Sequence, residues 1–213
     1  MKYIFLDFNG TIIDDVDLCL NLLNQILDKQ HKRNVTKEEY KSIFTFPVKK
    51  YYELAGIDFN LNSFEELADW FIKTYQPLSL SCGLFPKSVE TFKTLKEMGY
   101  HLVILSASEK NNLKEQCDSY NISSYFDEIL GIDNIHAAGK IEIALKFMKE
   151  HQIKGEDVLF VGDTLHDLEV GKAMWASVML VSCGHQSIEV LKQGGVPIID
   201  STYDLVSRLE RVS

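Results

Sequence analysis

The chain has 213 residues, of which 46% are hydrophobic and 25% charged, a composition typical of globular proteins and sufficient for one domain or one domain with an insertion. Its 31 acidic and 22 basic side chains give a net charge of −9. This acidic balance argues against non-specific binding to nucleic acid or to anionic membranes. An anionic substrate would therefore need a local site, such as a metal ion or a few lysines.

The four cysteines are far apart and form no CxxC pair or zinc-ligand pattern, so we expect reduced thiols. A strand pattern begins almost at the first residue, which leaves no room for a signal peptide. No apolar run approaches the ~18 residues that span a bilayer. These features predict a cytoplasmic protein with neither a membrane nor a nucleic acid as its partner.

The first 80 residues predict one strand followed by helices. Residues 3–12 form an apolar run that contains Asp7, and we expect a buried strand to stop at this carboxylate. Apolar residues spaced by three or four positions predict a helix from residue 16. Capping boxes predict two further helices, at Thr36 with Glu39 and at Ser63 with Glu66. The segment 16–80 is therefore expected to be all helical.

Strands and helices alternate in the rest of the chain. A helix is predicted from Pro86 to Met98. Strand-like runs then occupy 101–106, 127–130, 157–162 and 177–182, and a helical pattern separates each from the next. Such alternation indicates a parallel sheet with right-handed crossovers. We therefore predict an α/β fold, with a doubly wound, Rossmann-like core formed by residues 1–15 and 81–213 and an all-helical domain inserted at 16–80.

Polar side chains stand where three of these strands end. Asp7 ends the first strand of the predicted core, Ser106 the second and Asp163 the fourth, so they should meet at one edge of the sheet. Lys140, near the start of a helix, could reach the same edge. Carboxylates are hard oxygen ligands suited to Mg²⁺, and one held there can act as a nucleophile. Lys140, Ser106 and the amides of the turn after Asp7 could hold phosphoryl oxygens, so the set predicts phosphoryl transfer.

Each feature has a simpler interpretation when taken alone. The Asp-x-Asn-Gly-Thr sequence at 7–11 is more often a turn, Ser106 a strand-end hydroxyl and Lys140 a solvated lysine. The run 162–167 could be no more than a capped helix start. These interpretations weaken together, because all the features occur in order at one sheet edge.

At these residues the chain resembles the haloacid-dehalogenase-like hydrolase superfamily, in the subgroup that carries a helical cap after the first strand. The first motif of its phosphatases, Asp-x-Asp-Gly-Thr, matches residues 7–11 except at Asn9. The second matches the apolar run ending in Ser106, and the third matches Lys140, although the usual following proline is Ile141 here. The fourth, Gly-Asp-x-x-x-Asp, matches 162–167. The cap type and length resemble those of phosphoglycolate phosphatases.

The resemblance implies a role for each matched residue. Asp7 would be the nucleophile and a Mg²⁺ ligand, Asp163 the second main carboxylate ligand, and Asp167 a group that orients the metal or its water. The main-chain carbonyl of Asn9 would also coordinate the metal. The phosphoryl group would be held by Asp7, Phe8, Asn9, Ser106, Ala107 and Lys140. In the cap, Lys49 lies in the segment 46–50, where these enzymes place a substrate-specificity loop, and would reach into the site.

Asn9 is the departure that changes the chemistry. In the family a carboxylic acid at this position protonates the leaving oxygen and then activates water. An amide can position water but cannot transfer the proton, and loss of acid–base help costs ~10²–10⁴-fold in rate. We therefore expect weak turnover, worst for alkyl phosphates, and faster turnover after Asn9→Asp.

Three other functions stay open. Dehalogenases and phosphonatases also lack the second Asp of the first motif. Dehalogenases work without Mg²⁺, and their fourth motif lacks the Gly-Asp pair, whereas Asp163 is present here. A phosphonatase needs a Schiff-base lysine in the cap, in the region of Lys49 and Lys50. A phosphate-binding or regulatory module would keep the pocket without the turnover.

Residues and resemblance together predict a Mg²⁺-dependent phosphatase of small phosphorylated metabolites that acts through an aspartyl phosphate. The cap would open to admit substrate and close to exclude bulk water. The protein would act as a monomer or a homodimer.

Overall fold

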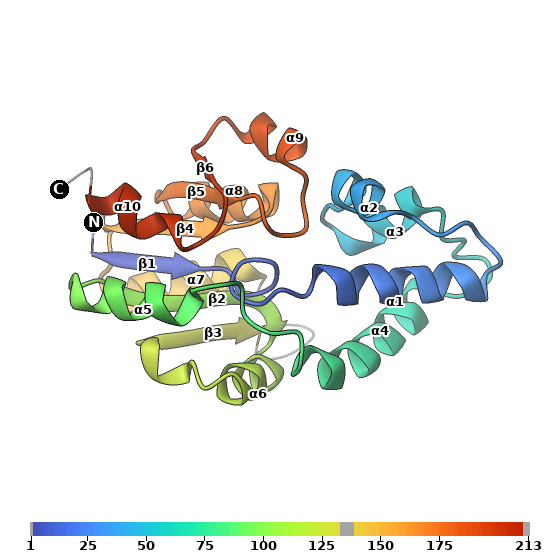
Figure 1. Cartoon of the computed structure of the whole chain (residues 1–213), viewed down its shortest axis with the longest axis horizontal. Coiled ribbons are helices and arrows are strands. Elements are labelled where there is room, and N and C mark those ends of the chain that lie inside the picture. Colours follow the sequence, from blue (N-terminus) through green and yellow to red (C-terminus); the bar gives the residue numbers. More distant parts are fainter. Residues whose placement is uncertain (1, 133–138, 211–213) are drawn as a thin grey trace.

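The computed structural model describes residues 2–132 and 139–210, and its centre is a parallel β-sheet (Figure 1). The described strands have the spatial order β3-β2-β1-β4-β5-β6, and each pairs with its neighbours in parallel. In chain order they are β1 Tyr3–Leu6, β2 His101–Glu109, β3 Glu128–Ile132, β4 Val158–Gly162, β5 Ser177–Val181 and β6 Ile198–Ile199. The chain reverses its winding direction beside β1, as in a doubly wound fold.

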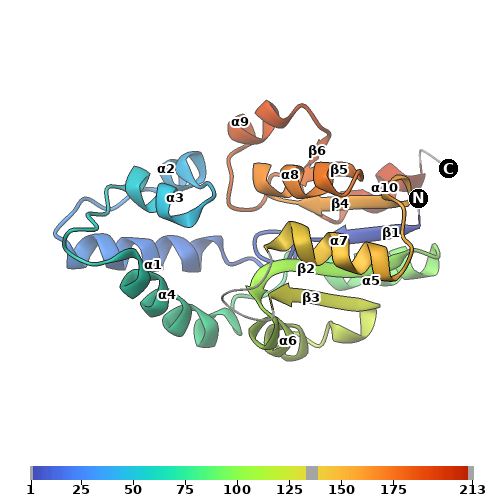
Figure 2. The same ribbon diagram turned by 180° about the vertical axis from the view of Figure 1, so that it is seen from behind.

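Helices cover both faces of the sheet because alternate strand residues point to opposite sides. One face packs on α5 (Ser88–Glu97), α6 (Lys110–Ser119) and α10 (Asp204–Glu210), through Ile4, Leu6, Ile104 and Val161. The other packs on α7 (Lys140–Glu150) and α8 (Leu165–Ala173), through Phe5, Val103 and Phe160. Figure 2 shows α7 and α8 in front of the sheet, whereas α5 and α10 are in front of it in Figure 1. The short helix α9 (Ile188–Leu191) follows β5.

Four helices follow β1 and lie together at one end of the molecule (Figure 1). They are α1 (Val16–Lys29), α2 (Lys37–Ile43), α3 (Val48–Ala55) and α4 (Phe64–Ser79). The side chains they bury against one another form a hydrophobic cluster separate from the two that flank the sheet, with Leu23, Tyr40, Tyr52 and Leu67 among its members. The strand arrow of β1 points toward these helices, so the carboxyl edge of the sheet faces them.

The predicted fold class is confirmed, with differences in detail. Residues 16–80, all of which the structure describes, contain no strand, and both capping boxes are formed at α2 and α4. The structure adds α3 within a segment expected to be a loop, and adds β6. It also extends β2 to Glu109, three residues beyond the expected end, with a register shift after Leu105. The helix expected from Pro86 begins at Ser88.

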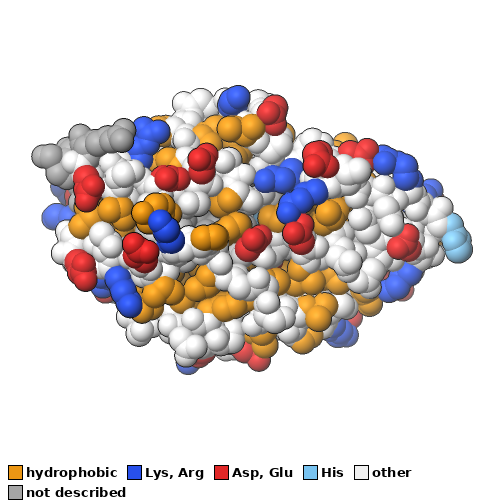
Figure 3. Space-filling view, in the orientation of Figure 1, with side chains coloured by type: hydrophobic (Ala, Val, Ile, Leu, Met, Phe, Trp, Pro, Cys, Tyr) orange, Lys and Arg blue, Asp and Glu red, His pale blue; other side chains and the backbone are white. Residues whose placement is uncertain are grey.

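The surface is mixed in charge. On the face seen in Figure 3, acidic and basic side chains are interspersed with hydrophobic ones. None of the described helices combines the length and the apolar character needed to cross a membrane. All four cysteines are free.

Candidate active site

Asp7 directly follows β1, and the chain turns sharply behind it. The Asp7 amide donates to the carbonyl of Val161 on the neighbouring strand at 2.8 Å, which anchors the start of the turn. Gly10 has a φ of +68°, a conformation that glycine adopts without strain. A Cβ atom at Gly10 would lie 2.4 Å from Oδ2 of Asp163. Glycine at this position therefore allows a second carboxylate to approach the turn.

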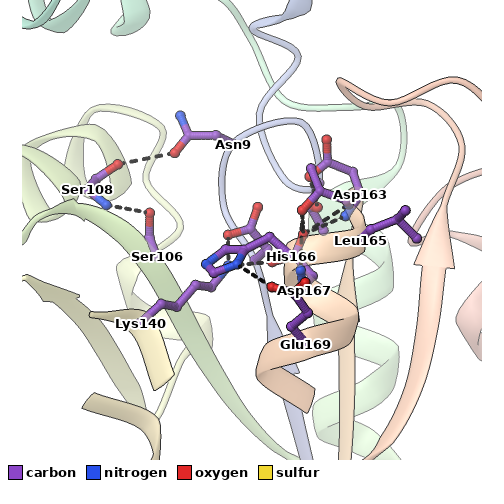
Figure 4. Close-up of polar contacts among 12 residues, drawn as sticks. Asn9, Ser106, Ser108, Lys140, Asp163, Leu165, His166, Asp167 and Glu169 are labelled. Atoms are coloured by element: carbon purple, nitrogen blue, oxygen red, sulfur yellow. Dashed lines mark hydrogen bonds and ion pairs between the residues drawn. The ribbon is translucent and has the colours of Figure 1, made fainter. Parts of the chain in front are cut away.

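Lys140 joins two of the predicted carboxylates. Its Nζ lies 2.5 Å from Oδ1 of Asp7 and 2.6 Å from Oδ1 of Asp167 (Figure 4). Lys140 is the first residue of α7 and only 5% exposed, so the simpler interpretation of a solvated helix lysine is wrong. A buried ammonium shared by two carboxylates holds both in fixed positions.

The first turn of α8 positions Asp167 and Asp163. Thr164 is the N-cap of α8, and its hydroxyl donates to Oδ2 of Asp167 at 2.7 Å. The amides of Asp163 and Thr164 donate to the same oxygen, at 3.1 and 3.0 Å. Asp163 itself accepts from the amide of His185 at 2.6 Å and from the hydroxyl of Thr11 at 3.3 Å. The run 162–167 is thus a capped helix start, as the simpler interpretation held, and it also carries two of the predicted site residues.

Burial shapes the ionisation of these groups. It raises the pKa of Asp7 well above its usual value, against the attraction of Lys140, and raises the pKa of Asp163 to about 6. Burial also acts to raise the pKa of Asp167, but the Lys140 ammonium outweighs it and the pKa is lowered. Burial acts to lower the pKa of Lys140, but Asp167 and Asp7 outweigh it and the pKa is raised.

The three carboxylates fit a divalent cation. Single oxygens of Asp7, Asp163 and Asp167 all lie within 4.8 Å of one another, and all three residues are buried. Their combined charge when ionised exceeds that of the one ammonium among them. Burial is the main cause of the raised pKa values of Asp7 and Asp163, and repulsion from the neighbouring carboxylates adds to it. An all-oxygen donor set favours a hard cation such as Mg²⁺ or Ca²⁺.

A cavity of about 360 Å³ opens beside these groups, between the sheet edge and helices α1–α4. Ser106 and Ala107 line it together with Asp7 and Lys140, as expected for phosphoryl-binding residues. Ser106 is 1% exposed, and its Oγ accepts from the amide of Ser108 at 3.1 Å. The Phe8 side chain is fully buried in the core, so only its main chain is available to a ligand.

Asn9 lines the same cavity and is held on both sides of its amide. Its Nδ2 donates to Oδ2 of Asp15 at 3.0 Å and to the hydroxyl of Tyr75 at 2.6 Å. Its Oδ1 accepts from the hydroxyl of Ser108 at 3.2 Å (Figure 4). The Tyr75 hydroxyl in turn donates to Asp15 at 2.6 Å. Because a carboxylate only accepts hydrogen bonds, Asp15 fixes the direction in which the Asn9 amide points.

Comparison with known proteins agrees with this geometry. A family model described as haloacid dehalogenase-like hydrolase matches residues 3–181. The chain belongs to this family. A phosphoglycolate phosphatase from Aquifex aeolicus is 29% identical over 203 residues, covering 85% of this chain and 89% of that protein. A pyrophosphatase PpaX from Anoxybacillus flavithermus is 25% identical over 175 residues, covering 79% of this chain and 78% of that protein.

Solved structures show the same fold. A haloacid dehalogenase-like family hydrolase from Streptococcus pneumoniae superposes with a TM-score of 0.83 at 16% identity, over 98% of both chains. A predicted phosphatase from Clostridium acetobutylicum does so with a TM-score of 0.82 at 19% identity, over 99% of this chain and 98% of that one. The family recognised from the four motifs is thereby confirmed, and with it the assignment of the chain as a phosphoric monoester hydrolase of this family.

The motifs of the haloacid dehalogenase-like family did not indicate a second group of residues beside Asn9. Asp15 is 1% exposed and accepts from the Gly10 amide at 2.9 Å and from Nε2 of His185 at 3.2 Å. The Nδ1 of His185 lies 2.8 Å from the hydroxyl of Tyr40. Burial acts to lower the pKa of His185, but Asp15 outweighs it and raises the pKa to about 9. His185 follows β5 closely, so the strand-end argument that found Asp163 could have found it as well.

The structure does not bring Lys49 to the site. Residues 48–50 are the first turn of α3 rather than a loop, and Lys49 is exposed. Its Nζ lies 5.4 Å from the centre of the Phe59 ring, and Lys49 is not among the residues that line the cavity. Lys50 does not line it either, so the described cavity presents no cap lysine for the Schiff base of a phosphonatase.

Proposed function

We propose that the chain is a Mg²⁺-dependent phosphatase of small phosphorylated metabolites in which Asp7 is the nucleophile. The observation that carries the proposal is the bridge from Lys140 to Asp7 and Asp167, with Asp163 within 4.8 Å, at the wall of a cavity. A buried cation beside clustered carboxylates is a suitable environment for a phosphoryl group, since it compensates charge that develops on its oxygens.

The metal-binding residues would be Asp7, Asp163 and the main-chain carbonyl of Asn9, with Asp167 orienting them. Mg²⁺ would neutralise charge on the phosphoryl oxygens and on the attacking carboxylate. Asp167 already accepts three hydrogen bonds from the start of α8 and a fourth from Lys140, so its position is fixed before any ligand binds.

The residues of the chain would act in two steps. An oxygen of Asp7 attacks phosphorus in line, the bond from phosphorus to the leaving oxygen breaks, and an aspartyl phosphate forms. Lys140, the Ser106 hydroxyl and main-chain amides of the two loops, including those at Phe8, Asn9 and Ala107, hold the phosphoryl oxygens. Water then attacks phosphorus and releases Asp7. Asn9 can orient that water, but it cannot accept its proton, so the second step is slow.

We further infer that residues 16–80 form a cap domain over a core of residues 1–15 and 81–213. The separate hydrophobic cluster of α1–α4 supports this division, because each part then has a core of its own. The cavity lies between the two parts, so movement of one against the other would open and close it.

A panel of phosphate esters, with Mg²⁺ and with a chelator, tests the proposal. Phosphoglycolate and pyrophosphate belong in the panel because relatives carry their names. We expect Mg²⁺-dependent release of phosphate, and its loss in Asp7→Asn. Asp28→Asn, which removes an exposed carboxylate from α1, is the matched control and should keep the activity. Undiminished activity in Asp7→Asn would overturn the proposal.

Asn9 favours a second candidate, a phosphate-binding module without turnover. The amide at position 9 is fully engaged by Asp15, Tyr75 and Ser108, and none of these contacts needs a catalytic role. This function predicts that phosphonates bind in the presence of Mg²⁺ while no ester of the panel releases phosphate. Measurable hydrolysis that depends on Asp7 would exclude it.

A further inference from the structure

The wall of the cavity that faces the sheet edge is aromatic and apolar. Every Phe and Tyr that lines the cavity in the described part of the chain belongs to the segment 40–75, namely Tyr40, Phe44, Phe46, Tyr51, Tyr52, Phe64, Phe71 and Tyr75. Val48, Ala68 and Ile72 add aliphatic surface. Ile72 is 55% exposed and Phe46 is 37% exposed, so part of this wall is open to a ligand.

Helix α4 and the stretch from α2 through α3 present these side chains to the cavity. Phe64, Ala68, Phe71 and Tyr75 recur at intervals of three or four residues and so occupy one face of α4. The rings of Phe71 and Tyr75 stack with centres 5.5 Å apart. The stretch from α2 through α3 supplies the opposite side, which includes Phe44 and Phe46 in the connection between the two helices.

Two rings of that opposite side pack against histidines of the core. The Phe44 ring lies 4.7 Å from that of His185, and the Phe46 ring lies 4.8 Å from that of His166. The aromatic wall is therefore continuous with the catalytic end of the cavity, where a phosphoryl group would sit.

The wall offers no free cation to a charged leaving group. Among the described lining residues Lys140 is the one Lys or Arg, and its ammonium is already bound to Asp7 and Asp167. The two lining histidines are also engaged, His185 with Asp15 and His166 with Glu169 at 3.3 Å. Glu109 lines the cavity as well. A leaving group that carries a carboxylate or a second phosphate would be desolvated here without a partner, which is costly.

Asn9 restricts the leaving group in a second, independent way. An amide cannot protonate the leaving oxygen, so this oxygen must depart as an anion. A phenol is far more acidic than an aliphatic alcohol, because the ring delocalises the charge. An aryl leaving group therefore needs the missing acid least.

We propose that the substrate is a monophosphate ester of an uncharged aromatic group, bound with its ring against α4 and the Phe46 segment. This inference rests on the proposed function. Asp7 forms the bond to phosphorus, the aryl–oxygen leaving group takes the electron pair of the broken bond, and it gains its proton from water after release. The ring would pack on Phe46, Phe71 and Ile72, which are in place around it.

Binding of phosphonates tests the ligand class without turnover. With Mg²⁺ present, calorimetry should give a Kd for benzylphosphonate at least about 10-fold lower than for ethylphosphonate, and weaker binding still for phosphonoacetate. Tighter binding of phosphonoacetate than of benzylphosphonate would overturn the inference. Because no phosphate is transferred, this result does not depend on whether the proposed phosphatase reaction occurs.

Steady-state kinetics test the leaving group. Phenyl phosphate and benzyl phosphate both carry a ring, but only the first releases a phenol. The leaving group departs in the first step, which kcat/KM reports, so kcat/KM should be ~10²-fold higher for phenyl phosphate. Phosphoglycolate should show the lowest kcat/KM of the three. Equal kcat/KM values for phenyl and benzyl phosphate, or a preference for phosphoglycolate, would contradict the assignment.

Two equally exposed positions provide a matched pair of variants. Ile72 lines the cavity and Leu54 does not, and both side chains are 55% exposed on cap helices, so neither substitution threatens the core. Ile72→Lys should weaken benzylphosphonate binding and strengthen phosphonoacetate binding, each by about 10-fold. Leu54→Lys should change neither. Equal effects of the two variants would show that the aromatic wall does not select the ligand.

Discussion

At the residue scale, the amide at position 9 and the carboxylate at position 15 form one unit. Asn9 Nδ2 lies 3.0 Å from Asp15 Oδ2, and the Tyr75 hydroxyl bonds to both groups. A carboxylate in place of Asn9 would face Asp15 across this distance, and the single proton of the Tyr75 hydroxyl could not bond to both carboxylates. Two carboxylates so placed cannot both ionise freely, and one pKa rises. The choice of residue at position 9 is therefore tied to that at position 15.

The hydrogen bond between Asn9 and Asp15 affects both the stability and the activity expected of an Asn9→Asp variant. The single variant should lose about 1–3 kcal/mol of unfolding free energy, because it removes a partly buried donor to the buried carboxylate of Asp15. The exchange Asn9→Asp with Asp15→Asn keeps one carboxylate and one amide, and should speed hydrolysis of benzyl phosphate by ~10²–10⁴-fold. Urea unfolding and steady-state kinetics measure the two effects.

The control for this exchange is Asp15→Asn alone, which restores no acid at position 9 and should give no gain in rate. If the exchange variant is folded but hydrolyses benzyl phosphate no faster than the parent, the absence of a proton donor at position 9 does not limit the rate.

Residues of the site differ in how far the sequence could predict them. Asp7 and Asp163 could be predicted to lie together, because strand ends of a parallel sheet share an edge. Lys140 was selected by its place near the start of a helix and by its match to the third motif, and its burial was not predicted. Asp15 and Tyr75 were not, because their roles depend on a contact between the core and α4 that no local pattern contains. The expectation for Lys49 failed because it assumed a loop where α3 begins.

At the scale of elements, the N-terminus of α8 links stability to the site. Thr164→Ala removes the cap of α8 and one donor to Asp167, so it should cost about 1 kcal/mol of unfolding free energy and also lower kcat. Thr36→Ala removes the same kind of capping box from α2, where the cap contacts no carboxylate of the site. It should cost about the same stability and leave kcat unchanged. Equal loss of kcat in both variants would mean that the α8 cap acts only through stability.

Elements with long periodic patterns were predictable from the sequence, and short ones were not. The alternating strands and helices after residue 83 have several buried residues each, so their hydrophobic residues recur in the sequence at the spacing typical of a strand or a helix. Helix α3 has eight residues, and its signals are Pro47 before it and the left-handed Gly56 after it, which also fit a loop. Strand β6 has two residues, so it depends on its pairing with β5.

At the scale of the whole molecule, the excess negative charge at the sheet edge should make the protein respond to Mg²⁺. A cation bound by the folded state alone adds about 2.7 kcal/mol at 100 times its Kd, so thermal denaturation should shift upward. Burial raises the pKa of Asp163 to about 6 without the cation, so below that pH a proton must leave before the metal binds. The Mg²⁺-induced shift in Tm should therefore be larger at about pH 7 than at about pH 5.

Variants separate this effect from general salt stabilisation. Asp163→Asn removes a proposed ligand and should abolish the shift, whereas Asp28→Asn removes an exposed carboxylate and should retain it. A shift that survives in Asp163→Asn would place the cation elsewhere.

The most direct test of the account is the time course of the first turnover with 4-nitrophenyl phosphate and Mg²⁺. In the proposed mechanism the acidic leaving group would make attack by Asp7 fast, and Asn9 would make hydrolysis of the aspartyl phosphate slow. We therefore predict a burst of nitrophenolate of about one equivalent per chain, with phosphate on the peptide that contains Asp7 after acid quenching. Linear release from the first turnover, with no phosphate on Asp7 while hydrolysis continues, would contradict it.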